Sequence, residues 1–538
     1  PAPQAARPMA SAPSVADAVP RNLSGAATTL TRRVLPMGNH PVPACGGRAP
    51  VPPPAASKRT RTLPGRALRP VEPATGRLGV VADRPIVIVS NRGPVSFRYG
   101  DGGELVAKRG AGGLVSGIGP LVAGTDATWI AAAMSDADRE AAAGGVIEAE
   151  GFRVRALAVD PDDFRLAYDV VCNAVLWFVH HGLFETARRP RFDRRWREAW
   201  AAYRRVNDAF ADAVIADAPE GAAVLVQDYH LCLMAPRVAE RRPDLALIHF
   251  SHTPFAPPEL LRVLPDADAH ELLAGMAAHD ACGFHCTRWA ADFEASARLA
   301  LGESPRTFVS PLPSDPDDLT AVATSDAGVA ARAELEREVG DRRLLVRVDR
   351  IELSKNLLRG FLAYDDLLAT HPEWRGQVVF GAFVYPSREG LPEYLAYRQE
   401  VERVVADINR RWATPGWTPI LYDASDDFPR SLAALALADV LLVNPVRDGL
   451  NLVAKEGTLL SARRSVLALS PEAGVWEEVG HTALRVHPFD LAGTSDALHA
   501  ALSMPADERA EQHERRLAVV EARRPADWLA ALLAAAGA

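Results

Sequence analysis

The chain has 538 residues, about three times the ~150 residues of a typical domain, so we expect two large domains or one very large one. It is 48% hydrophobic and 24% charged, and no apolar run approaches the ~20 residues that cross a bilayer, which indicates a core-forming protein rather than a membrane protein. The formal net charge of -8 gives no basic footprint for a nucleic-acid partner.

The first 84 residues differ in kind from the rest. They hold 15 of the 42 prolines, contain no aromatic residue and carry a net charge of +9. Such a segment has too few large apolar groups to offset the entropy lost on folding. We therefore predict that residues 1–84 are a disordered extension. The five cysteines of the whole chain are an odd and sparse set, which favours a reducing, cytoplasmic location over a disulfide framework.

From residue 86 onward, short apolar runs alternate with longer segments of helical spacing, which is typical of a doubly wound α/β fold. The Pro-rich stretch 311–316 separates an earlier group of these runs from a later one, so the sequence predicts two domains, 85–315 and 316–538. The predicted strands are 86–90, 223–227, 245–251, 344–348, 377–383 and 440–444.

In open α/β sheets, ligands bind at the carboxyl ends of strands, so polar residues just after each run are candidates. Asp228 follows one predicted strand and His252 follows the next, where a carboxylate and an imidazole can face one site. Residues 110–114 form a glycine-rich loop whose amides could approach an anion, although a plain strand-to-helix turn fits as well.

An octet at 279–286 contains two cysteines and two histidines. A tetrahedral zinc site normally draws ligands from two separated elements, whereas alternate residues of one strand point to opposite faces. We therefore interpret the octet as a core strand and predict no metal site.

Lysine is rare in this chain, with four lysines beside 56 arginines. Arg350 and Lys355 lie five positions apart at a predicted strand-to-helix junction, which suits a diphosphate, although a salt-bridged surface turn is the alternative. The segment 447–456 opens a helix with a polar, glycine-containing turn. There Glu456 could accept two hydrogen bonds from a ribose diol.

Taken in order along residues 86–533, the motifs of the chain resemble those of the trehalose-6-phosphate synthase family, whose members are retaining glycosyltransferases of the GT-B fold. The resemblance implies two Rossmann-like domains that face a cleft. The motifs that carry it are Ser-Asn-Arg at 90–92, Gly-Gly-Leu at 112–114, Asn-Ala-Val-Leu-Trp at 173–177, Asp-Tyr-His-Leu at 228–231, His-Thr-Pro-Phe at 252–255, Arg350 with Lys355, Pro-Ser-Arg at 386–388, 447–456, and Ser-Pro-Glu-Ala-Gly at 470–474.

The resemblance implies that the enzyme moves glucose from GDP- or UDP-glucose to glucose 6-phosphate and forms α,α-trehalose 6-phosphate with retention. It implies no cofactor and no metal. The catalytic residues it implies are Arg350, Lys355, His252, Asp228 and Asp448. The acceptor site it implies is Arg92, Tyr168, Trp177, Asp228 and Arg388. The donor site it implies is Gly112, Gly113, Arg350, Lys355, Asp448, Gly449, Asn451, Leu452 and Glu456.

The partners that we expect are the two small-molecule substrates. We expect no nucleic-acid or membrane partner, and the sequence is compatible with a homo-oligomer. Two alternatives stay open. One is a related transferase with another sugar-phosphate or pseudo-sugar substrate, as in validoxylamine phosphate synthases. The other is a catalytically silent sugar-phosphate sensor, against which the pairing of Arg350 with Lys355 argues.

The sequence departs from the family pattern at two places. Residues 350–356 keep both cations but end in Asn356 where the family has glycine. This variant resembles actinomycete members, some of which use GDP-glucose. Pro313 stands where the family has a permissive glycine in the hinge between the domains, so we expect restricted hinge motion.

Overall fold

The computed structural model describes residues 84–100, 102–110 and 113–537. The predicted disordered extension, apart from Arg84, and the predicted donor-site residue Gly112 lie outside the described residues. In the part of the chain that is described, no helix combines the length and apolarity that a membrane crossing requires.

The first sheet has eight strands in the order β10-β9-β8-β7-β1-β4-β6-β5, and all neighbours are parallel except β5 with β6. Its central strands are buried along their length, which is why they appear in the sequence as continuous apolar runs. The strands are β1 (Ile86–Ser90), β4 (Thr128–Ala132), β5 (Val146–Ala149), β6 (Phe152–Leu157), β7 (Ala223–Gln227), β8 (Ala246–Ser251), β9 (Ala281–Phe284) and β10 (Thr307–Val309).

Helices cover both faces of this sheet, and alternate residues of a strand pack into different cores. Val87 and Val89 face a core built with α5 and its neighbours, whereas Ile88 faces a core that includes α1. The first core is covered by α3 (Pro161–Arg165), the π-helix η1 (Leu166–Leu176), α4 (Trp177–His181), α5 (Arg194–Asp217), α6 (Ala235–Arg241), α7 (Pro258–Leu261), α8 (Asp266–Ala277) and α9 (Thr287–Leu301). The remaining elements of this part are α1 (Gly113–Val122), the hairpin of β2 (Val95–Tyr99) and β3 (Leu105–Arg109), α2 (Asp136–Ala142) and the 3-10 turn η2 (Tyr229–Leu231).

The second sheet has six parallel strands in the order β13-β12-β11-β14-β15-β16. Its strands are β11 (Arg343–Arg350), β12 (Val378–Tyr385), β13 (Ile420–Asp423), β14 (Val440–Val443), β15 (Val466–Leu469) and β16 (Leu484–Arg485). The predicted class, α/β with two Rossmann-like sheets, is therefore confirmed.

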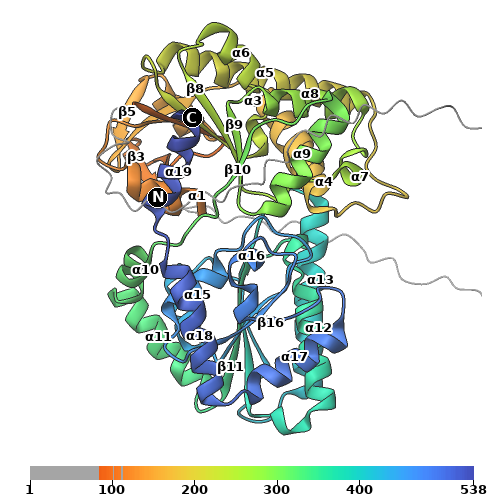
Figure 1. Cartoon of the computed structure of the whole chain (residues 1–538). Coiled ribbons are helices and arrows are strands. Elements are labelled where there is room, and N and C mark those ends of the chain that lie inside the picture. Colours follow the sequence, from red (N-terminus) through yellow and green to blue (C-terminus); the bar gives the residue numbers. More distant parts are fainter. Residues whose placement is uncertain (1–83, 101, 111–112, 538) are drawn as a thin grey trace, which may run out of the picture. The chain divides into compact units, whose positions relative to one another are not determined.

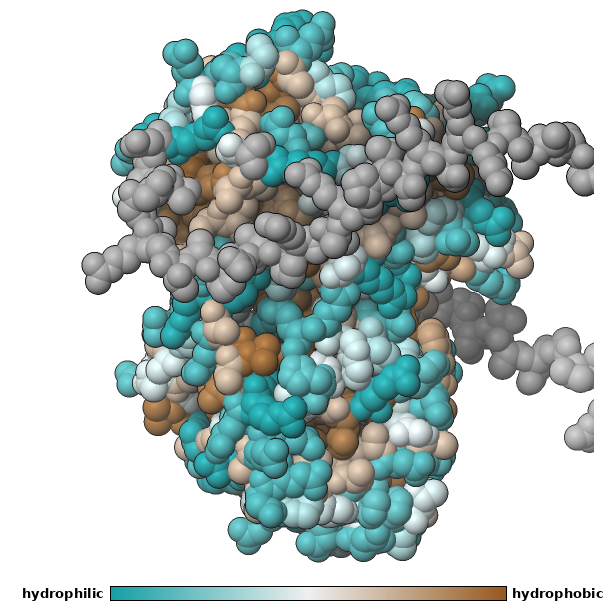
Figure 2. Space-filling view, in the orientation of Figure 1, coloured by the Kyte–Doolittle hydropathy of each residue, from teal (hydrophilic) through white to brown (hydrophobic). Residues whose placement is uncertain are grey.

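Two groups of helices cover the second sheet, one on each face (Figure 1). One group contains α10 (Pro316–Ala323), α11 (Asp326–Val339), α14 (Phe428–Leu437), α15 (Val453–Leu460), α16 (Trp476–Val479) and α18 (Ala506–Glu521). The other contains α12 (Leu357–Thr370), α13 (Pro392–Trp412) and α17 (Leu491–Ser503). The short turns are η3 (Leu353–Lys355), η4 (Pro372–Trp374) and η5 (Gly480–Thr482). On the face seen in Figure 2, hydrophilic residues predominate over this part of the molecule, as expected for helices whose apolar stripes face the sheet.

The last helix, α19 (Pro525–Gly537), returns to the first sheet, where it packs on α1 and β8 (Figure 1). The indole of Trp528, fully buried, donates to the carbonyl of Ser310 at 3.0 Å and meets the ring of Phe250 edge-on. The strands of the first sheet thus precede the proposed boundary, and those of the second sheet follow it. By its contacts, α19 is part of the layer around the first sheet. The domain bounds 85–315 and 316–538 stay a prediction.

Candidate functional site

Five of the predicted site residues lie at or just after the carboxyl ends of parallel strands. Arg92 follows β1, Asp228 follows β7 and His252 follows β8 in the first sheet. Arg350 ends β11 and Asp448 follows β14 in the second sheet. Because parallel strands end at one edge of a sheet, each sheet presents these side chains on one rim.

Arg388, in the loop after β12, lies among aromatic rings from both parts of the fold. Its Nη1 donates to the Tyr394 hydroxyl at 2.7 Å, and its Nη2 donates to the Tyr229 hydroxyl at 3.4 Å. The guanidinium carbon lies 5.1 Å from the centre of the buried Trp177 ring. Trp177 and Tyr229 belong to elements around the first sheet, so Arg388 joins the second sheet to the first.

Glu352, which is 1% exposed, fixes the two arginines of the second sheet's rim. Its Oε1 lies 3.1 Å from Nη1 of Arg388 and 3.3 Å from Nη1 of Arg350. Burial alone would raise the pKa of this carboxyl, but the two guanidiniums lower it to about 2. The sequence analysis gave Glu352 no role, although an acidic residue between Arg350 and Lys355 was a signal that could have found it.

Arg92 and Arg388 both act on the ring of His230. Arg92 Nη2 donates to the Tyr168 hydroxyl at 3.2 Å, and the Tyr168 ring stacks on His230 with centroids 5.8 Å apart. Burial, and then the charges of Arg388 and Arg92, lower the pKa of His230 to about 3. Tyr168 lies in the π-helix η1, a form of helix that recurs at functional sites. Each arginine is therefore linked to the neutral His230 through a tyrosine that stacks with it, Arg92 through Tyr168 and Arg388 through Tyr229.

Asp228 adopts a backbone conformation that is uncommon for its type, with φ of 68°. Its Oδ1 accepts a hydrogen bond from the backbone N–H of His252 at 3.2 Å. Burial raises the pKa of this carboxyl to about 6, against the lowering effect of backbone donors and of Arg388. Asp228 can therefore bind hydroxyls as a weakly acidic carboxyl held in one position.

His252 is one member of a chain of three polar side chains. The Leu312 N–H donates to His285 Nδ1 at 3.3 Å, so His285 carries its proton on Nε2 and donates to His252 Nδ1 at 3.2 Å. His252 in turn carries its proton on Nε2 and donates to Gln227 Oε1 at 2.9 Å. Burial lowers the pKa of His252 to about 4 and also lowers the pKa of His285 well below its usual value, so both imidazoles are neutral near pH 7. The chain fixes the tautomer of His252.

The segment before Pro313 is fixed through Leu312, whose backbone N–H and carbonyl both have side-chain partners. His285 accepts its N–H, and Lys455 Nζ, 3% exposed, donates to its carbonyl at 3.0 Å and to Glu478 at 2.9 Å. Lys455 lies in the segment 447–456, and the structure gives it structural partners in Leu312 and Glu478.

Lys355 is part of a buried network of charges at the end of β11. Its Nζ donates to Asp448 Oδ2 at 2.7 Å and lies 3.7 Å from Asp349 Oδ1. Burial opposes both charges, but each partner stabilises the other, so the pKa of Lys355 is raised and that of Asp448 is lowered. Asn451 donates to the same Asp448 oxygen at 3.1 Å. Arg350, by contrast, keeps a side chain that is 45% exposed and accessible to a ligand.

Gly449 brings the loop after β14 against the backbone of His252. A Cβ at this position would lie 1.9 Å from the His252 carbonyl oxygen, so only glycine allows the approach. The same loop is held by Trp289, whose indole donates to the Gly449 carbonyl at 2.9 Å, and by Arg447, whose Nη2 donates to the Phe255 carbonyl at 2.7 Å. The predicted residues His252, Asp448 and Gly449 are therefore neighbours.

Glu456 lies in the first turn of α15, five residues beyond Asn451. Within the described residues, its carboxylate has no hydrogen bond or ion pair with a side chain. Burial raises its pKa to about 7, although Lys355 lowers it. Leu452 accepts the backbone N–H of Glu456 at 2.9 Å and thereby belongs to the turn that positions this carboxylate.

Asn356 occupies the position where the resemblance leads one to expect glycine. Its φ of 61° and ψ of 39° are left-handed, a conformation that asparagine tolerates better than most residues. Its amide also donates to the carbonyls of Asn444 and Pro488 at 2.9 and 2.7 Å. The departure therefore keeps the backbone turn. Gly113 begins α1, while its neighbour Gly112 lies outside the described residues.

Side chains of the Cys/His octet bond to groups outside the octet. Cys282 donates to the Met276 carbonyl, His279 Nδ1 bonds the same carbonyl, and His285 contacts His252. This is the core-strand arrangement that we expected.

Another group that could hold a metal, by the spacing of its ligand atoms, is His371, Glu373 and His499. Its two imidazoles stack with an interplanar angle of 11° and centroids 3.7 Å apart. Parallel rings at this separation cannot aim their in-plane lone pairs at one ion. His499 Nδ1 also accepts the Trp374 indole N–H at 3.0 Å.

Comparisons with known proteins found relatives and solved structures that are similar over most of the chain. The chain is 33% identical over 79% of its length to a bifunctional trehalose-6-phosphate synthase/phosphatase of Thermoproteus tenax, and it spans 59% of that relative. A trehalose-6-phosphate synthase of Mycobacterium sp. (strain JLS) is 32% identical over 79% of the chain and is itself covered to 90%.

Two solved structures are similar over 84% of the chain, each at 26% identity and a TM-score of 0.73. One is an E. coli structure bound with UDP-2-fluoro glucose, covered to 99%, and the other is an α,α-trehalose-phosphate synthase from Burkholderia xenovorans in complex with glucose-6-phosphate, covered to 100%. The sequence profile described as glycosyltransferase family 20 matches residues 84–537, so the chain belongs to that family.

Proposed function

We propose that the protein transfers glucose from a nucleotide-glucose to glucose 6-phosphate with retention at the anomeric carbon, and so forms α,α-trehalose 6-phosphate. The observation that carries the proposal is that Arg92 and Arg388, from the two parts of the fold, donate to the hydroxyls of Tyr168 and Tyr229, whose rings both stack with His230. Two cations linked to one neutral ring suit the phosphate of an acceptor sugar. The glucose-6-phosphate complex of the Burkholderia xenovorans relative supports the same acceptor.

The acceptor site that we propose contains Arg92, Tyr168, Trp177, Asp228 and Arg388. Arg92 and Arg388 bind the phosphate, and the Tyr168 hydroxyl, which already accepts from Arg92, donates its proton to it. Trp177 supports Arg388 from below its guanidinium plane. Asp228, aimed by the His252 N–H, binds sugar hydroxyls.

The donor site that we propose contains Gly113, Asn451 and Leu452, together with six residues whose roles we assign as follows. Arg350 and Lys355 bind the diphosphate, and the unpaired carboxylate of Glu456 binds the ribose diol. His252, Asp448 and Gly449, which are neighbours, bind the glucose that is transferred. The E. coli relative bound with UDP-2-fluoro glucose supports a nucleotide-sugar donor, and either UDP- or GDP-glucose fits the proposal.

The leaving nucleotide diphosphate gains negative charge as the glycosidic bond breaks. Arg350 and Lys355 stabilise that charge from fixed positions, because Glu352 and Asp448 hold them before the substrate binds. We expect the reaction to need no metal, since these side chains supply the positive charge. The acceptor proton leaves with the departing phosphate oxygen on the same face of the sugar.

The test is an assay of the purified full chain with glucose 6-phosphate and each of UDP-, GDP- and ADP-glucose. Release of one nucleotide, formation of an α,α-linked disaccharide phosphate by NMR, and retention of activity in EDTA are the expected results. Nucleotide release with a pseudo-sugar acceptor alone would contradict the proposed acceptor. Binding of glucose 6-phosphate without turnover of any donor would make the protein a sensor and contradict the proposal.

A further inference from the structure

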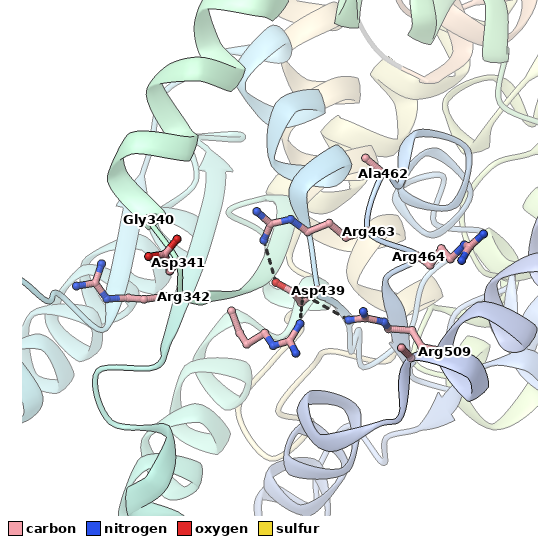
Figure 3. Close-up of a pocket in the computed structure, with 10 residues that line it drawn as sticks. Gly340, Asp341, Arg342, Asp439, Ala462, Arg463, Arg464 and Arg509 are labelled. Atoms are coloured by element: carbon pink, nitrogen blue, oxygen red, sulfur yellow. Dashed lines mark hydrogen bonds and ion pairs between the residues drawn. The ribbon is translucent and has the colours of Figure 1, made fainter.

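A cavity of about 790 Å³ lies at the amino ends of β11, β14 and β15, at the far end of these strands from the candidate site. Arg343 begins β11, whereas Arg350 ends it, so the two ends are about 23 Å apart at ~3.3 Å per residue. The cavity is open to solvent and is lined mainly by arginines (Figure 3). We call it the arginine pocket; none of its residues belongs to the site proposed above.

Three guanidiniums from separate elements converge on one buried carboxylate in this pocket. Asp439, 4% exposed, lies 2.8 Å from Arg343 Nη1, 3.1 Å from Arg463 Nη1 and 3.4 Å from Arg509 Nη1. Asp439 also accepts the Leu344 N–H at 2.9 Å. The dashed contacts in Figure 3 show this convergence.

The charge of this group is not balanced. Three guanidiniums face one carboxylate, and each guanidinium has five N–H donors of which Asp439 takes one. The side chains of Arg343, Arg463 and Arg509 are 48%, 34% and 19% exposed, so the remaining donors are accessible. The other lining carboxylate, Asp341, does not point toward the three arginines in Figure 3.

We propose that the arginine pocket binds the phosphate group of a small phosphorylated metabolite. A phosphate monoester carries about -1.5 to -2 charges near pH 7, which matches the excess of two positive charges, and its oxygens suit the planar fork of arginine. The volume lies within the ~300 to 1,000 Å³ of small-ligand sites, so there is room for a sugar or nucleoside beside the phosphate. Asp439 holds the three guanidiniums in place for the ligand.

A purely structural ion-pair network is the competing interpretation, since the same contacts tie together the amino ends of the strands. It predicts no ligand. The two interpretations differ in what happens when a phosphate compound is added, and the pocket can be tested in the intact chain because hydrogen exchange reports on each segment separately.

The experiment measures amide hydrogen exchange of the full chain by mass spectrometry during titration with inorganic phosphate, ribose 5-phosphate and AMP. We expect protection of peptides that cover 340–344, 439–443, 462–466 and 506–509 at lower concentrations of the esters than of phosphate. The Arg509→Gln variant should need at least tenfold more ligand for the same protection. Arg464→Gln is the matched control, because Arg464 lies in the same lining but points away from Asp439 in Figure 3.

No protection of these peptides by any of the three compounds would overturn the proposal, as would equal protection in the Arg509→Gln variant. Protection by inorganic phosphate as strong as that by the esters would overturn the assignment of a metabolite. Should Arg509→Gln fail to fold, Arg463→Lys keeps the charge and removes the fork, and it should weaken protection in the same peptides.

Discussion

The two rims that form the candidate site hold their polar groups in opposite ways. On the first sheet's rim, the imidazoles of His230, His252 and His285 are neutral, His285 donates a hydrogen bond to His252, and the pKa of Asp228 is raised to about 6. On the second sheet's rim, the groups are ionised and paired: Glu352 with Arg350 and Arg388, and Lys355 with Asp448.

This difference teaches how one site can bind both sugars and a diphosphate. Neutral donors and acceptors can exchange hydrogen bonds with one another for hydrogen bonds with sugar hydroxyls. Fixed cations, by contrast, stabilise a phosphate that gains negative charge. Arg388 reaches from the charged rim to the aromatic rings of Tyr229 and Trp177 beside the neutral one. The predictions below perturb the neutral rim, the charged rim, and the residues that link them.

Lowering the pH should destabilise the neutral rim before it affects the charged rim. Burial holds the pKa of His252 at about 4 and that of His230 at about 3, and it also lowers the pKa of His180, His181 and His279. The unfolded chain binds these protons near pH 6.5 and the native chain does not, so stability is full above about pH 6.5 and falls as the pH drops toward 4. Each excess proton costs ~1.4 kcal/mol per pH unit, and we expect unfolding within this window.

Asp228 opposes this trend, because its raised pKa lets the native chain take up a proton below about pH 6. Glu456 acts in the same direction below about pH 7, but these two carboxyls cannot offset the five histidines. Urea unfolding at pH 8, 7, 6 and 5 measures the effect, and the exposed-residue variant His481→Gln should leave the slope unchanged. A free energy of unfolding that stays constant between pH 7 and 5 would contradict neutral burial of the histidines.

Removing a cation from the charged rim should slow turnover most. We expect Lys355→Ala and Arg350→Ala each to lower kcat/KM by about two orders of magnitude or more, the scale of one lost fixed charge at the leaving group. Arg410→Ala, at an exposed position of α13, should leave kcat/KM unchanged. Near-normal turnover of a folded Lys355→Ala variant would contradict its assignment to the diphosphate.

Arg388 should affect the acceptor more than the donor. A charged hydrogen bond contributes ~1.5 to 3 kcal/mol, so Arg388→Ala should raise KM for glucose 6-phosphate about tenfold to hundredfold. The Kd for the nucleotide-glucose, titrated without acceptor, should change little. Arg398→Ala on α13 is the surface control. If donor affinity collapses while the acceptor KM holds, Arg388 belongs to the nucleotide site.

Much of the fold could be predicted because buried parallel strands leave continuous apolar runs in the sequence. The run at 86–90 and the run at 223–227 coincide with β1 and β7. β6 was missed because Arg153 and Arg155 interrupt its apolar pattern near the sheet's edge, whereas β4 was missed although its short run is uncharged and buried. The return of α19 to the first sheet could not be predicted either, because no local pattern records which sheet a terminal helix covers.

The candidate site was predictable where it depends on strand ends, and not where it depends on contacts between distant segments. Asp228, His252 and Arg350 follow apolar runs in the sequence and lie at the rims in the structure. The pairing of His285 with His252 joins residues 33 positions apart, and the pairing of Glu352 with Arg388 joins residues 36 positions apart. The roles assigned to the site residues stay predictions.

His285 should act on His252 through the tautomer that it fixes. A glutamine at 285 can accept the Leu312 N–H through its oxygen and donate to His252 Nδ1 through its nitrogen, whereas leucine can do neither. We therefore expect His285→Leu to lower kcat about tenfold, the loss of one hydrogen bond of ~1.4 kcal/mol, and His285→Gln to restore most of it. Equal activity of the two variants at matched stability would mean that His285 only fills space.

Glu456 should give the smallest effect and the sharpest test of the donor side. Its pKa of about 7 means that the carboxylate is about a tenth ionised at pH 6 and about nine tenths ionised at pH 8. Only the ionised form accepts both hydrogen bonds from a ribose diol, so KM for the nucleotide-glucose should fall several-fold, by up to about ten, as the pH rises from 6 to 8. The measurement uses saturating glucose 6-phosphate, so that ionisation of the acceptor does not contribute. Glu456→Gln cannot titrate, and its KM should be higher at pH 8 and nearly independent of pH. A native enzyme whose donor KM is also flat across this range would show that Glu456 does not bind the ribose, and the charged rim would then recognise the diphosphate alone.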